Sequence, residues 1–148
     1  MFRRRDFPLD CLAALAEVPG VRLVNLHQGE GREELKVWPR RSLVHDPGSE
    51  IDKDHGAFMD TAAIMANLDL VITSDTAIAH LAGAIGVPVW VALPYAADWR
   101  WLLGRSDSPW YPTMRLFRQQ RPGEWGGVFT EMHAALRLGG SLALPAAS

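Results

Sequence analysis

The stretch that decides the fold is LVITSDTAIAHLAGAIGVPVWVALP, residues 70–94. It begins with the short apolar run Leu70-Val71-Ile72, rich in β-branched residues, which predicts a buried strand over residues 70–74. A second apolar run, Val89–Leu93, predicts another buried strand. Residues 76–85 between them have helical spacing, and Gly86 follows where a helix favours a left-handed terminal residue. A strand, a helix and a strand in this order predict a parallel β–α–β unit.

The helix expected over residues 76–85 has an apolar side and a polar side. At about 100° per residue, the first side carries Ile78, Leu81, Ala82 and Ile85, and the second carries Thr76, His80 and Gly83. We therefore expect the first side to pack against the sheet and the second to face away from it.

The beginning of this helix is a candidate anion site. Ser74, Asp75 and Thr76 are residue types that favour a helix start, and the N–H groups of Asp75, Thr76 and Ala77 lack intrahelical acceptors. With the helix dipole they favour an anion by about 0.3–1 kcal/mol. Thr76 adds a hydroxyl and His80 an imidazole, so a phosphate would meet three kinds of donor.

A second interpretation of the same residues stays open. Asp75 would simply cap the helix, and His80 would be a surface histidine whose hydrogen bonds are satisfied within the protein. A capping carboxylate competes with phosphate for the same N–H groups. On the phosphate-binding hypothesis, Asp75 is therefore expected to face the hydroxyls of a sugar or ribose.

Two longer segments, taken together, are similar to a known family. They are DTAAIMANLDLVITSDTAIAHLAGAIGVPVWVALP (residues 60–94) and DWRWLLGRSDSPWYPTMRLFRQ (residues 98–119). Together they span about two fifths of the chain and closely resemble the C-terminal half of glycosyltransferase family 9-like proteins. These are heptosyltransferase relatives that often follow tetratricopeptide repeats in bacteria, although this chain shows no such repeat.

The resemblance implies a fold and a site. It implies one half of a two-domain GT-B fold, a Rossmann-like α/β domain with an open, mostly parallel sheet. In that family the matching segment lies at the nucleotide-sugar diphosphate, which implicates Asp75, Thr76, Ala77 and His80. Many relatives have glycine where this chain has Ala77, and glycine permits closer approach of the main chain to phosphate.

Length and composition set the broad class. A chain of 148 residues, 48% hydrophobic and 22% charged, predicts one globular domain, here over residues 1–138, with a disordered tail at 139–148. The formal net charge of −2 gives no electrostatic case for nucleic acid as a partner. The one cysteine, Cys11, fits core packing in a reducing compartment. No apolar run reaches the length of a membrane span, so a cytoplasmic location is expected.

The remaining elements follow from local patterns. We expect helices over residues 8–18, 33–38, 61–68 and 124–138, and strands over residues 21–26, 42–45 and 114–118. Asp60 is expected to cap the helix at 61–68, after a polar loop at 46–56.

Other kinds of functional site fit the sequence less well than a nucleotide-sugar site. Asp52-Lys53-Asp54 matches the Asp-x-Asp pattern of metal-dependent glycosyltransferases, but Lys53 would oppose a cation and the GT-B fold needs no metal, so none is expected. Neither a glycine-rich phosphate motif nor a Gly-x-Ser-x-Gly elbow occurs, which disfavours dehydrogenases, P-loop enzymes and serine hydrolases.

Polar and aromatic residues elsewhere are secondary candidates. Gln28 follows the strand expected at 21–26 and would hydrogen-bond a base or ribose, or else serve as a polar turn residue. Trp99 and Trp101 would flank a sugar or base, or form a buried cluster that braces their loop.

The function expected from these observations is a nucleotide-sugar-binding half of a glycosyltransferase. In the resembled family the acceptor site and general base belong to an N-terminal domain, and nothing here matches it. No catalytic residue is therefore assigned, and glycosyl transfer by this chain alone is not expected. The alternatives are a non-enzymatic binding or assembly module and an epimerase-like enzyme acting on nucleotide sugars.

The resemblance also implies a missing strand. In the resembled proteins one more strand precedes the segment that matches residues 5–9, and it lies centrally, between the strands matching 21–26 and 70–74. Its absence would leave two strand edges unpaired. We expect a homodimer, or a partner chain that supplies the acceptor-binding half.

Overall fold

The computed structural model describes residues 7–28, 31–54, 56–97, 101, 106–108 and 110–138. The tail expected at 139–148 and Trp99 lie outside the described residues. The elements in chain order are α1 (Asp10–Ala16), β1 (Leu23–Val24), α2 (Arg32–Val37), the 3₁₀ helix η1 (Arg41–Leu43), β2 (Val44–His45), α3 (Met59–Met65), β3 (Val71–Ser74), α4 (Ala77–Ile85), β4 (Val89–Leu93), β5 (Met114–Arg118) and α5 (Trp125–Arg137).

The named strands form two sheets, and within each sheet the strands are parallel. One sheet has the order β3-β4-β5, with Val71 opposite Val89 and Val89 opposite Met114. The other pairs β1 with β2, with Leu23 opposite Val44. The prediction of an α/β fold with parallel strands is thus confirmed, and the strands fall into two sheets.

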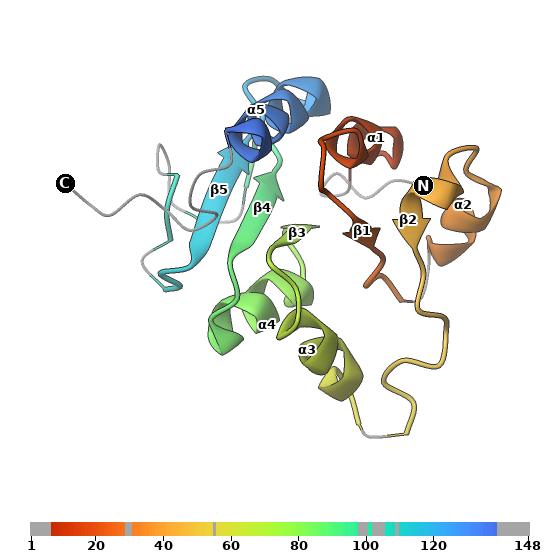
Figure 1. Ribbon diagram of the computed structural model, residues 1–148. Helices are drawn as coiled ribbons and strands as arrows, with labels where there is room; N and C mark the ends of the chain where they lie inside the picture. Colours follow the sequence, from red (N-terminus) through yellow and green to blue (C-terminus); the bar gives the residue numbers. More distant parts are fainter. Residues whose placement is uncertain are drawn as a thin grey trace.

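β4 is the centre of the larger sheet, and each of its residues is buried. A strand buried on both faces must be covered on both, and its continuous apolar sequence reflects that demand. Helices α1 and α5 lie on one side of this sheet and α3 and α4 on the other (Figure 1). The result is a layer of strands between two layers of helices.

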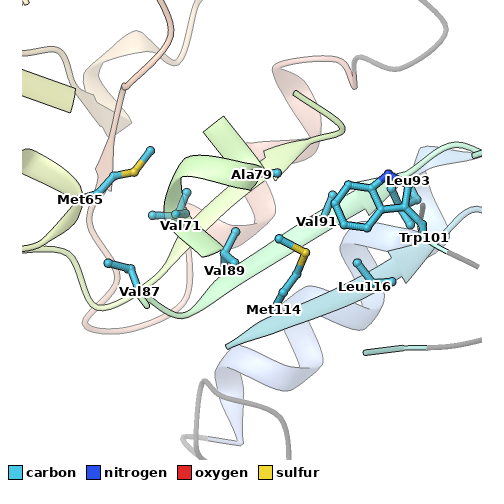
Figure 2. Close-up of a cluster of buried hydrophobic side chains, with 11 residues drawn as sticks. Met65, Val71, Ala79, Val87, Val89, Val91, Leu93, Trp101, Met114 and Leu116 are labelled. Atoms are coloured by element: carbon cyan, nitrogen blue, oxygen red, sulfur yellow. The ribbon is translucent and has the colours of Figure 1, made fainter. Parts of the chain in front are cut away.

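Alternate residues of the strands build two cores. Val89, Val91 and Leu93 of β4 pack with side chains of α3 and α4 in one cluster, together with Met114 and Leu116 of β5 (Figure 2). Trp90 and Ala92 point to the opposite face, where Phe117 joins them against α5 and α1. Cys11 lies at the edge of this second core, and burial raises the pKa of its thiol.

The expected elements agree with the structure most closely in the second half of the chain. The strands Val89–Leu93 and Met114–Arg118 have the expected bounds. Toward the N-terminus, β1 is shorter than expected, and η1 takes the place of the first part of the strand expected at 42–45.

The cap expected for α3 is wrong. Asp60 lies inside the first turn, and the cap position is Phe58, in the left-handed region with φ of 64°. Instead the carboxylate of Asp52 accepts hydrogen bonds from the backbone N–H of Thr61, at 3.0 Å, and from its hydroxyl. Asp60 in turn accepts a bond from the backbone N–H of Asp52 at 2.8 Å.

The buried side of α4 also differs from the expected one. Its buried residues are Ala79, Ala82 and Gly83, whereas Ile85 is 42% exposed. Small side chains let the helix approach its neighbours closely, so packing distance outweighs the hydrophobicity of Ile85. Gly83, expected on the outer side, is therefore an inner contact.

Candidate functional site

The candidate site lies where β3 leads into α4. Strand β3 ends at Ser74, and Thr76 is the cap residue, with extended backbone angles of φ −136° and ψ 173°. The Thr76 side chain makes no capping hydrogen bond, and Asp75 does not cap the helix either, among the described residues. The first N–H groups of α4, beginning with Ala77, therefore have no side-chain cap in the described part of the chain.

Hydroxyl and carboxyl groups gather at this junction. The Oγ1 atoms of Thr73 and Thr76 lie 3.1 Å apart, within hydrogen-bond distance. Ser74 and Asp75 are buried, with Asp75 only 7% exposed. A buried carboxylate that does not cap the adjacent helix is costly unless it has a partner.

His80, one turn into α4, is held between two aromatic rings. Its ring is stacked on that of Trp101, with centroids 5.4 Å apart and planes 20° apart. Its Nδ1 lies 3.2 Å from the hydroxyl of Tyr111. Nε2 has no hydrogen-bond partner among the described residues. His80 is half-buried, and its Nδ1 is satisfied within the protein, so these contacts are compatible with both interpretations of this residue.

Trp101 connects His80 to the core that contains Val91 and Leu93. Its side chain is fully buried, beside Val91 and Leu93 (Figure 2). The expectation of a buried aromatic residue is confirmed for Trp101. Its indole Nε1–H has no hydrogen-bond partner among the residues that the structure describes, and a buried donor of this kind normally has an acceptor.

The end of β5 contributes two residues that the sequence patterns did not single out. Arg118 donates a hydrogen bond to the backbone carbonyl of Trp101, and burial lowers the pKa of its guanidinium. The side chain of Gln119 accepts hydrogen bonds from the backbone of Tyr95 (3.0 Å) and Gly123 (3.4 Å). The feature that could have identified them is their position, because both stand at the carboxyl end of a parallel strand, where ligands bind in open α/β sheets.

Gln28 lies in a separate network that follows β1 and β2. Its side-chain amide donates to the backbone carbonyl of Gly48 at 3.3 Å. Nearby, Arg32 holds both carboxylate oxygens of Asp46 at 2.7 Å. Gln28 therefore braces the loop at Gly48. Among the described residues, no hydrogen bond joins it to the β3–α4 junction.

The first residue of the Asp-x-Asp segment, Asp52, has a structural role. Both oxygens of Asp52 serve Thr61 at the start of α3. Among the described residues, no group of three or more histidine, cysteine or acidic side chains is placed to hold a metal ion.

A hollow of about 540 Å³ lies elsewhere, at the C-terminal ends of α1 and α5. It is lined by Glu17, Val18, Pro19, His133, Leu136 and Arg137. None of the residues singled out above lines it. Among the described residues, no helix has both the length and the hydrophobicity needed to cross a membrane.

Comparison with known proteins gives a partial match to one bacterial protein. The chain is 35% identical over 141 residues to "Protein FlbA" of Caulobacter vibrioides. The match covers 91% of this chain but only 22% of that protein, so the chain spans about a fifth of its relative's length. No protein-family model and no solved structure matches the chain.

Proposed function

We propose that the β3–α4 junction binds the diphosphate of a nucleotide sugar, in the nucleotide-sugar-binding half of a GT-B glycosyltransferase of the family 9 type. The observation that carries this proposal is the start of α4, which no side chain caps in the described part of the chain. There the N–H donors, the Thr76 hydroxyl and the His80 imidazole lie within one helical turn. Helix N-termini with free N–H groups favour phosphate.

The neighbouring groups have roles in the same proposal. Asp75 does not occupy the N–H groups of α4, which removes the competition between carboxylate and phosphate. Its buried carboxylate is the candidate acceptor for sugar or ribose hydroxyls, and Gln28 is the candidate contact for base or ribose. The diphosphate is the leaving group of glycosyl transfer, and donors aimed at it would stabilise the charge that develops as the glycosidic bond breaks.

The test is calorimetric titration of the chain with UDP, ADP and GDP, each compared with its nucleotide sugars. A half-site without a facing domain is expected to bind one of them with an affinity of roughly −4 to −8 kcal/mol, in the millimolar to micromolar range. Because the helix start supplies the positive potential, the affinity should be unchanged by a metal chelator. Complete loss of binding in chelator would instead point to a metal.

Two variants locate the site. Thr76→Ala and His80→Ala should each weaken the binding of the preferred nucleotide by about 2- to 10-fold, the effect of one hydrogen bond. Thr130→Ala and His45→Ala are matched controls, since these exposed residues lie on α5 and β2. Equal affinity in all four variants, or no nucleotide binding by the wild-type chain, would overturn the proposal.

Turnover separates the proposed function from its alternatives. Hydrolysis or epimerisation of a nucleotide sugar by the chain alone would favour an epimerase-like enzyme. Binding without turnover fits a glycosyltransferase half, and restoration of transfer by a second chain would distinguish that half from a non-enzymatic module.

A further inference from the structure

Gly83 is an unusual residue for the middle of α4. Glycine destabilises a helix interior by about 0.5–1 kcal/mol relative to alanine, and Gly83 has no left-handed backbone angle to require it. The reason is steric. A Cβ atom at this position would lie 2.5 Å from Cγ of Tyr111 and 2.7 Å from its Cδ1, closer than side-chain atoms approach one another.

The contact lets the ring of Tyr111 lie directly against the helix. His80 stands one turn before Gly83, and the Tyr111 hydroxyl reaches its Nδ1 at 3.2 Å. The two rings meet edge to face, with centroids 5.8 Å apart and planes 61° apart. On another side of the imidazole, the stacked indole of Trp101 restricts its rotation. Two rings and one hydrogen bond therefore fix the orientation of His80.

We propose that Tyr111 is a positioning residue that holds His80 in the Nε2–H tautomer, and that the lack of a side chain at Gly83 leaves room for the Tyr111 ring. A phenol is a good donor and a neutral imidazole nitrogen a good acceptor, so the Tyr111 hydroxyl donates to Nδ1. The proton of the neutral ring then resides on Nε2, the nitrogen without a partner among the described residues.

The consequence is a histidine that donates without carrying a charge. A neutral imidazole can either donate or accept at a given nitrogen, and the hydrogen bond at one nitrogen decides the role of the other. With Nδ1 accepting from Tyr111, Nε2–H is committed to donation, which suits a phosphate oxygen and not a cation. This inference rests on the proposed function for its ligand, but the tautomer is a property of the chain without ligand.

The tautomer is measured directly by long-range ¹H–¹⁵N NMR of the ligand-free protein at pH 8.5, well above the usual histidine pKa of about 6.5. The chain has five histidines, and the His80 signals are those missing from His80→Ala. The wild-type signals should show a protonated Nε2 and an unprotonated Nδ1. Tyr111→Phe should give a mixture of tautomers, while Tyr95→Phe, which alters an exposed tyrosine, should not.

A predominant Nδ1–H tautomer in the wild-type protein, or a tautomer ratio unchanged by Tyr111→Phe, would overturn the inference. Gly83→Ala should reproduce the effect of Tyr111→Phe, since the added methyl displaces the Tyr111 ring. Gly126→Ala is its control, because a Cβ there meets nothing within 4 Å. If Gly83→Ala does not fold, Tyr111→Phe still decides the question.

A double-mutant cycle shows whether Tyr111 acts through His80. With the nucleotide that binds best, Tyr111→Phe should weaken affinity by about 2- to 10-fold in the wild-type background and cause no further loss in His80→Ala. Equal losses in both backgrounds would show that Tyr111 acts independently and would overturn the inference. A fixed Nε2–H tautomer in a protein with no nucleotide affinity would overturn the proposed function and support the positioning role.

Discussion

Asp46 shows how a single carboxylate organises the end of the smaller sheet. It accepts hydrogen bonds from the backbone of Gly48 and the side chains of Asn25 and Arg32. Burial acts to raise its pKa, but these bonds and the charge of Arg32 outweigh that effect, so the pKa of Asp46 lies below its usual value. The same loop carries the carbonyl that Gln28 contacts.

A carboxyl whose pKa is lowered on folding stabilises the folded state above its unfolded pKa and loses that contribution as the pH falls through its folded pKa. Asp46→Asn should therefore lower the free energy of unfolding at pH 7, and the difference from wild type should shrink below pH about 3.9, the usual aspartate value. Denaturant unfolding across this range measures it.

Glu33→Gln is the control for this prediction. Glu33 pairs with Lys36 on the surface, with both side chains largely exposed, and such pairs contribute little. A difference for Asp46→Asn that stays constant from pH 7 to pH 3 would contradict the assignment of its effect to the carboxylate charge.

At the scale of an element, α3 depends on a residue outside it. The carboxylate of Asp52 satisfies the backbone N–H of Thr61, although Asp52 stands well before the helix and has a left-handed φ of 65°. Asp52→Ala should lower the free energy of unfolding by about 1 kcal/mol, as for the loss of a helix cap. Asp54→Ala, which alters the exposed second aspartate of the same motif, should have little effect in the same unfolding measurement.

The opposite ranking, with Asp54→Ala the more destabilising, would show that the motif stabilises the fold in some other way. It would also reopen the hypothesis that the Asp-x-Asp segment binds a cation, which the contacts of Asp52 disfavour.

The helices and strands differ in how far the sequence predicted them. Strands β4 and β5 were predictable to the residue, because β4 is a continuous apolar run and β5 follows a proline and a threonine that bound it. The buried side of α4 was not predictable, because the hydrophobic pattern places Ile85 inside and takes no account of the space that Gly83 leaves. The cap of α3 was not predictable either, because Asp52 reaches the helix across a loop.

The candidate site likewise contains some residues that the sequence could predict and others that it could not. The segment from Ser74 to His80 is continuous in sequence, so its polar groups could be found from their spacing. Tyr111 and Arg118 come from distant parts of the chain and reach the site only because β5 lies beside β4 and the segment before it packs on α4. No local pattern records such a contact.

At the scale of the whole molecule, β3 is an edge strand within the described residues. The backbone N–H of Val71 donates to the carbonyl of Pro88, the residue before β4, at 2.9 Å. Alternate residues of a strand direct their backbone groups to opposite sides, so Ile72 directs its N–H and C=O away from β4. No named strand pairs with that side of β3 in the described part of the chain.

An edge of this kind is a template for another strand. We therefore expect the chain to self-associate through the outer edge of β3, or to bind a partner chain there. Sedimentation equilibrium at micromolar concentration should give a mass above the 16.4 kDa of one chain. Ile72→Pro should reduce association, because proline removes the outward N–H and leaves the bonds from β3 to β4 in place.

Ile72→Ala is the matched control for this edge. Ile72 packs against the second core, so both substitutions remove apolar contacts, but only proline removes the N–H donor. Association retained in Ile72→Ala and lost in Ile72→Pro would assign the interface to backbone pairing at β3. A wild-type chain that sediments as a 16.4 kDa monomer would contradict self-association and leave the edge to a partner chain. Equal loss in both variants would place the interface on the packed face of the sheet.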